Sequence, residues 1–174
     1  MLAGCGRGWG CASVRPMSAA IVLSLHVRTL TEAHAAARRA AALCARPQRA
    51  EPGLYELLVN AIEHGNLEIG HALKTELRAS GQWEAEVARR LASPGLGERR
   101  AQLAAWRTAE GWCFEIADAG RGFDWLPWLA LDPVRSRAPS GRGIALARAL
   151  HFDRLEFLPP GSRVRAHVHE PSVD

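Results

Sequence analysis

The chain has 174 residues, of which 48% are hydrophobic, so it is long enough for one domain with its own apolar core. Its formal net charge is +4, but Lys and Arg form no long run, which argues against a nucleic-acid-binding surface. No apolar stretch approaches the roughly 18 residues of a membrane span. The 4 cysteines show no paired spacing, which argues against disulfide and zinc frameworks and fits a reducing cytoplasm.

The N-terminal part of the domain is predicted to hold one strand and one helix after a disordered tail. Residues 1–17 are rich in glycine and lack periodicity, so we expect a tail there, a single domain over residues 18–174, and Met1 or Met17 as the start. β-branched residues predict a strand at Ile21–Val27. An alanine-rich stretch predicts a helix from its N-cap, Thr31, to Ala45, and Pro47 stops it.

A second helix is predicted from Glu51 to His64, with Pro52 in its first turn and Gly65 just past its end. Residues 67–92 follow as a helical insertion in which apolar residues recur every fourth position. This period fits two amphipathic helices or one broken helix. The apolar stripe suits core packing or an interface.

The C-terminal part is predicted to be mostly strands. It begins with a β-hairpin that turns at Glu110-Gly111, followed by a long loop rich in Gly and Pro, a short helix and two strands. In chain order these elements lie at residues 100–117, 118–142, 144–150, 152–158 and 163–170. This order predicts an α+β fold, a two-layer sandwich with helices on one face of a mixed, mostly antiparallel sheet.

Three polar side chains follow one another at intervals of four in the second helix: Glu56, Asn60 and His64. Because i and i+4 lie one turn apart on one face, this helix can hold a base and an amide oxygen beside the same ligand. An amide oxygen is a hard, neutral donor that suits Mg²⁺, and a glutamate can orient or deprotonate a nucleophile. The plainer alternative is that Glu56 and Asn60 are solvated and His64 favours the helix dipole.

Two glycine-containing motifs follow. Asp118 comes directly after an apolar strand, and Gly120 and Gly122 allow a close backbone approach or a positive φ. A carboxylate at a strand end can accept a hydrogen bond from the exocyclic amine of a base. Gly141 and Gly143 lead into an amphipathic helix, whose first N–H groups can bind an anion. The alternatives are an ordinary glycine-rich turn and a helix start whose glycines permit close packing.

The order of these three motifs resembles the GHKL ATPases, the histidine-kinase-like superfamily that includes the catalytic domains of histidine kinases and DNA gyrase. The segment Glu56–Asn66, "ELLVNAIEHGN", is especially similar to the first motif of the bacterial anti-sigma-factor serine/threonine kinases. The resemblance covers roughly residues 21–169.

This resemblance implies a role for the residues expected to bind Mg²⁺ and adenine and to act as general base. Glu56 matches the general base, and Asn60 matches the Mg²⁺ ligand. Asp118 matches the aspartate that binds the adenine amino group. Gly120 and Gly122 belong to the same motif, and Gly122 is expected beside the adenine ring.

The resemblance also implies a phosphate end. Gly141 and Gly143 match the glycines that bring backbone amides to the phosphates, and His64 is expected to support the same side. Residues 123–140 match the ATP lid, which is short here, as in the anti-sigma kinases. The arginine expected to contact the γ-phosphate is Arg135, Arg137 or Arg142.

The function implied by the resemblance is that of a cytoplasmic serine/threonine protein kinase using ATP and Mg²⁺. Its substrate would be an anti-sigma-factor antagonist, and it would sequester a sigma factor by partner switching. A receiver or serine phosphatase protein and a homodimer are further expected partners, whereas nucleic acid and membrane are not. Two alternatives stay open: an ATP-dependent binding module with little turnover, and a histidine-kinase-type catalytic domain.

Overall fold

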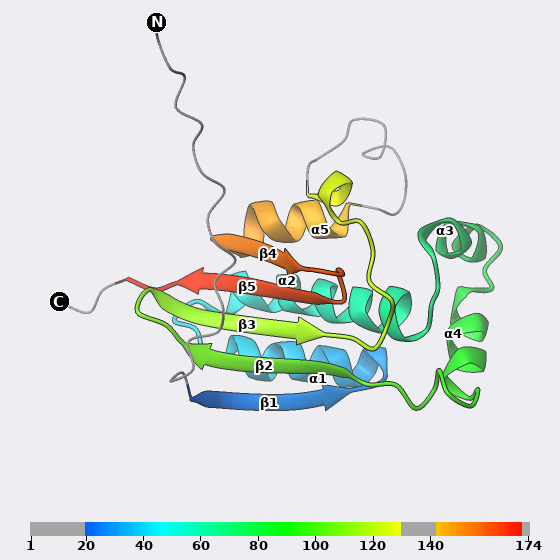
Figure 1. Ribbon diagram of the computed structural model, residues 1–174, viewed down its shortest axis with the longest axis horizontal. Coiled ribbons are helices and arrows are strands. Elements are labelled where there is room, and N and C mark those ends of the chain that lie inside the picture. Colours follow the sequence, from blue (N-terminus) through cyan, green and yellow to red (C-terminus); the bar gives the residue numbers. More distant parts are fainter. Residues whose placement is uncertain (1–19, 130–141, 172–174) are drawn as a thin grey trace, which may run out of the picture.

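Helices cover one face of a single β-sheet in the computed structural model, which describes residues 20–129 and 142–171 (Figure 1). The sheet has five strands in the order β1-β2-β3-β5-β4, and each neighbouring pair is antiparallel. The predicted α+β sandwich is therefore confirmed, with an antiparallel sheet where a mixed one was allowed. The predicted tail lies outside the described residues.

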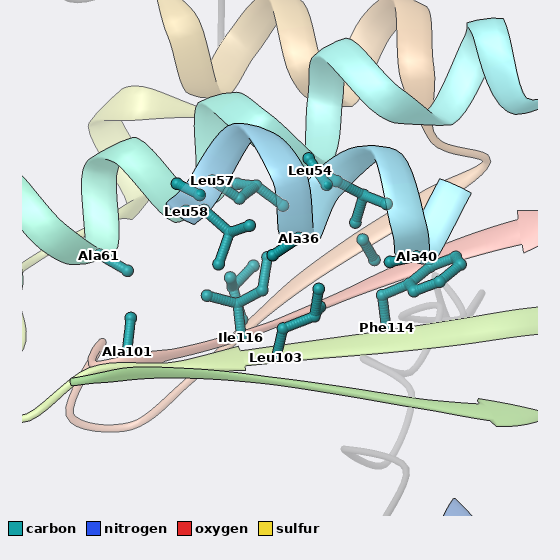
Figure 2. Close-up of a cluster of buried hydrophobic side chains, with 14 of the residues drawn as sticks. Ala36, Ala40, Leu54, Leu57, Leu58, Ala61, Ala101, Leu103, Phe114 and Ile116 are labelled. Atoms are coloured by element: carbon teal, nitrogen blue, oxygen red, sulfur yellow. The ribbon is translucent and has the colours of Figure 1, made fainter. Parts of the chain in front are cut away.

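The strands lie close to their predicted positions. Their bounds are Ile21–Val27 (β1), Ala101–Arg107 (β2), Gly111–Ala117 (β3), Arg154–Leu158 (β4) and Arg163–His169 (β5). β2 and β3 form the predicted hairpin. Alternate residues of β3, Phe114 and Ile116, are buried and point toward the helices (Figure 2). The sheet thus presents an apolar floor to the helical layer.

Helix α1, Leu30–Ala41, is shorter than predicted and has a different cap. Its N-cap is Thr29, whose side chain accepts a hydrogen bond from the backbone N–H of Glu32 at 3.2 Å. The Glu32 carboxylate in turn accepts from the backbone N–H of Thr29 at 3.3 Å. This reciprocal capping box makes the prediction of Thr31 wrong, because the glutamate three residues on completes the box for Thr29. The helix ends at Ala41, four residues before the predicted end.

Small side chains let α1 pack closely on its neighbours. Its buried residues are all alanines: Ala33, Ala36, Ala37, Ala40 and Ala41. Figure 2 shows Ala36 and Ala40 directed into the cluster that contains Leu54 of helix α2 and Phe114 of β3. A protein core of this density leaves little room for a larger residue on this helix face.

We predict that Ala40→Leu lowers the free energy of unfolding by about 1–3 kcal/mol, because the added carbons overpack a fully buried position. Ala35→Leu, on the exposed face of the same helix, is the matched control and should change it by less than about 0.5 kcal/mol. Urea denaturation measures both. Equal effects of the two substitutions would contradict the close packing of α1.

Helix α2, Pro47–Asn60, runs without a break into a π-helical turn, η1, at Ala61–Asn66. The prediction of a start at Glu51 is wrong because Pro47 itself occupies the first helical position, where a missing N–H costs nothing. Pro52 consequently lies inside the helix, and Gly65 lies inside η1 rather than past the helix end. π-Helical turns occur frequently at functional sites.

The remaining helices are short. Residues 67–92 contain two helices, α3 at His71–Ala79 and α4 at Trp83–Leu91. Of the two predicted alternatives, two amphipathic helices are therefore confirmed. A 3-10 turn, η2, lies at Leu126–Trp128. Helix α5, Gly143–Leu146, continues into a second π-helical turn, η4, at Ala147–His151. Within the two described ranges, no helix is long and apolar enough to cross a membrane.

Candidate functional site

A cavity of about 930 Å³ lies beside the C-terminal half of α2. Its walls come from α2, η1, α3, the segment after β3 and the start of α5. It brings together most of the predicted site residues that the structure describes: Glu56, Asn60, His64, Asp118, Gly122, Arg142 and Gly143. Gly120 is not among its lining residues, and Arg137 and Gly141 lie outside the described residues. A cavity of this size is in the range of small-molecule and cofactor sites.

Glu56 and Asn60 form the helical side of the cavity and contact each other. The side-chain N–H of Asn60 donates a hydrogen bond to Oε1 of Glu56 at 3.2 Å. This bond turns the amide so that Asn60 Oδ1 is the atom left for a ligand. A single amide oxygen on a helix that also lines a cavity is a suitable donor for Mg²⁺.

Gly143 lies directly against Glu56. A Cβ atom placed on Gly143 would be 1.6 Å from Oε1 of Glu56, far inside contact distance. A larger residue here would displace the Glu56 carboxylate, so the glycine allows α5 to approach it this closely. Because the first residue of α5 has no side chain, α5 packs closely on Glu56 and its first backbone N–H lies near the cavity.

We predict that Gly143→Ala lowers the free energy of unfolding by about 0.5–1.5 kcal/mol, because it forces the Glu56 carboxylate aside and breaks the hydrogen bond from Asn60. The same substitution in a Glu56→Ala background should cost much less, because the clashing atoms are gone. Urea unfolding of the four proteins in this cycle measures the coupling. Additive effects would contradict the contact.

Asp118 is held against the π-helical turn η1. A Cβ atom on Gly65 would lie 2.3 Å from the carboxyl group of Asp118, so glycine is needed for this approach. The side-chain oxygen of Asn66 accepts a hydrogen bond from the backbone N–H of Ala119 at 2.9 Å, and Gly120 N–H donates to Asp118 Oδ1 at 2.8 Å. Gly65 and Asn66 were not predicted as site residues, because their partners lie more than fifty positions away in the sequence.

Burial raises the pKa of Asp118 from 3.8 to about 6, and the Gly120 N–H and the Arg99 charge oppose this rise. Between these two pKa values the folded protein binds more protons than the unfolded chain. Stability therefore falls as the pH rises through this range, and the unfavourable contribution of ionised Asp118 is complete above about pH 6. A half-buried carboxylate with a raised pKa at a cavity wall is typical of a functional group.

We predict that Asp118→Asn makes the ligand-free protein more stable than wild type at about pH 7, with little difference at about pH 4, because the amide stays neutral throughout. The asparagine oxygen can still accept the bond from Gly120. Urea unfolding across this pH range measures the difference. A difference that stays constant with pH would contradict the buried state of Asp118.

His64 supports the loop after η1. Its Nδ1 atom donates a hydrogen bond to the backbone carbonyl of Ile69 at 2.5 Å. Burial lowers its pKa, and the neighbouring Lys74 charge acts in the same direction, so the ring is neutral near pH 7. His64 lines the cavity as predicted, and its role on the phosphate side stays a prediction.

The start of the predicted lid is anchored on the turn between β4 and β5. Gly122 has a φ of +79°, and a Cβ there would lie 2.1 Å from the carbonyl oxygen of Pro160. Phe123 packs edge-on against Phe157 at 5.5 Å, and Trp125 stacks on the same ring at 6.0 Å. Trp125 therefore covers Phe157. Trp128 instead contacts His71 of α3 and lines the cavity.

The family model of the histidine kinase-like ATPase domain matches residues 23–167. The chain belongs to this family. Searches of curated proteins and of solved structures found no match. Membership of this family makes the chain an ATP-binding regulator of the GHKL type, and domains of this type bind ATP typically with Mg²⁺.

The cavity fits such a ligand. Asp118 offers a half-buried carboxylate to a nucleotide base, and Asn60 offers an amide oxygen to a hard cation. Gly143 begins a helix at the cavity wall without a side chain in the way. The donor set is therefore compatible with Mg²⁺-ATP.

Proposed function

We propose that the protein is an ATP-dependent serine/threonine protein kinase that phosphorylates an anti-sigma-factor antagonist in a cytoplasmic partner-switching pathway. The observation that carries the proposal is the contact of Glu56 with Asn60 on one wall of the cavity. It puts a candidate base one helical turn from a candidate Mg²⁺ ligand. The similarity of the segment "ELLVNAIEHGN" to anti-sigma kinases supports the choice of substrate class.

In this mechanism the chain's own residues orient the reactants and remove one proton. Bound Mg²⁺ would supply charge neutralisation for the transferring phosphoryl group. Asp118 would hold the adenine base, and Asn60, which its bond to Glu56 keeps in place, would hold the ion through its side-chain oxygen. The substrate hydroxyl loses its proton to the Glu56 carboxylate at Oε2, since Oε1 already accepts the bond from Asn60. Its oxygen forms the bond to the γ-phosphorus while the bond to the β,γ-bridging oxygen breaks, which releases ADP.

A second candidate is an ATP-dependent binding module with little or no turnover. The close cover of Glu56 by Gly143 favours it, because a substrate hydroxyl must reach a carboxylate that the start of α5 already contacts. In that case nucleotide binding would regulate the affinity for a sigma factor or for its antagonist, and Glu56 would only line the site.

We predict that Glu56→Ala leaves the Kd for ATP within about threefold of wild type but lowers phosphotransfer about a hundredfold or more, since general-base catalysis contributes about that factor. The assay uses radiolabelled ATP and a purified anti-sigma-factor antagonist encoded in the same genome. Glu51→Ala, on the same helix but outside the cavity lining, is the matched control and should transfer normally.

The outcomes separate the two candidates. Unchanged transfer by Glu56→Ala would show that Glu56 is not the base. Tight ATP binding by wild type without transfer to any antagonist tested would exclude the kinase and leave the binding module.

A further inference from the structure

A buried ion pair joins α3 to the π-helical turn η1 at the cavity wall. Nζ of Lys74 pairs with the Glu63 carboxylate, and the two residues are 8% and 0% exposed. Both residues line the cavity together with Asn60 and His64. Glu63 belongs to the first motif, whereas Lys74 lies outside all three, and their contact brings the segment of residues 67–92 into the site.

Anchoring of α3 does not by itself explain why these two residues are charged. Removing two charges from water costs several kcal/mol per ion, and replacement of a buried pair by well-packed apolar residues is often neutral or stabilising. Leu73 and Leu77 of the same helix already pack against the core. The charges therefore need a second explanation, and the cavity beside them offers one, because an ammonium has three donors and Glu63 does not use all of them.

The position of Lys74 points to the phosphate end of the cavity. Glu63, which holds the ammonium, follows Asn60 by three residues, and all three residues line the cavity. The charge of Lys74 lowers the pKa of His64, whereas the cation that acts on Asp118 is Arg99. The charge of Lys74 thus acts on the wall that holds Asn60 and His64, and not on Asp118, the carboxylate expected to bind adenine.

The α3–α4 segment carries two more polar side chains at the cavity wall, His71 and Trp83. His71 Nε2 and Trp83 Nε1 are buried and have no hydrogen-bond partner among the described residues, and both residues line the cavity. Buried donors without partners cost stability unless a ligand or water satisfies them. Lys74 is thus the cationic member of a wall that also carries these two polar side chains.

We infer that Lys74 is a phosphate-binding residue, which Glu63 holds at the cavity wall and which donates hydrogen bonds to the β- or γ-phosphate of the nucleotide. The inference rests on the ATP binding that the proposed function requires, and it adds a contact from outside the three motifs. It predicts that the site distinguishes nucleotides by their phosphate number through α3.

The test is calorimetric titration of ATP, ADP and adenosine into wild type, Lys74→Gln and the double variant Glu63→Gln/Lys74→Gln. Both variants should bind ATP roughly ten- to a hundredfold more weakly, as expected for the loss of a charge-assisted hydrogen bond. Their affinity for adenosine should stay within about twofold of wild type, because adenosine carries no phosphate. The double variant leaves no unpaired buried charge, so it keeps the test valid if Lys74→Gln fails to fold.

Arg89→Gln is the matched control, because Arg89 is a cation of α4 that pairs with Glu86 and does not line the cavity. It should bind all three ligands as wild type does. Unchanged ATP affinity in the double variant, or an equal loss for ATP and adenosine, would overturn the inference. Normal ATP binding by wild type without phosphotransfer would reject the kinase proposal and leave the role of Lys74 standing, whereas no ATP binding by wild type would reject both.

Discussion

The packing of α2 across the sheet is the constraint on which the fold and the site both depend. Leu54, Leu57 and Leu58 bury one face of this helix against β2 and β3, as Figure 2 shows. Helical periodicity then fixes where the polar face points, so Glu56 and Asn60 must lie along the cavity. One helix thus supplies both the hydrophobic contact that stabilises the two layers and the polar groups that bind the ligand.

Glycines allow two other segments of the chain to approach α2 and the π-helical turn that follows it. The absence of a side chain at Gly65 lets Asp118 approach η1, and Asn66 holds the backbone after Asp118. Gly143 allows the equivalent approach of α5 to Glu56. The three motifs are therefore in contact with one another through positions without side chains, and the cavity is the space left between them.

The sequence predicts the strands and the hairpin well, because alternation of buried residues and turn chemistry are local signals. It predicts helix boundaries less well. The start of α1 depends on a capping pair, Thr29 with Glu32, that competes with the equally plausible Thr31. The start of α2 depends on which proline, Pro47 or Pro52, occupies its first turn, and both carry the same local signal.

The candidate site was likewise predictable from the sequence only in part. Resemblance of motifs predicts that Glu56, Asn60, Asp118 and Gly143 share one cavity, and the structure places them there. It does not predict the contacts that position them, such as that of Asp118 with Gly65, because these join segments far apart in the chain. Lys74 is unpredictable for the same reason, since only the folded structure brings α3 to η1.

The central claim is that this cavity binds ATP with the base against Asp118. The most direct measurement is a calorimetric titration of Mg²⁺-ATP into wild type and Asp118→Asn near pH 7.5. The account predicts saturable binding by wild type and a Kd at least about tenfold weaker for Asp118→Asn, because an amide oxygen is a weaker acceptor than a carboxylate for the adenine amine. Equal affinity of the two proteins, or no binding by wild type, would contradict it.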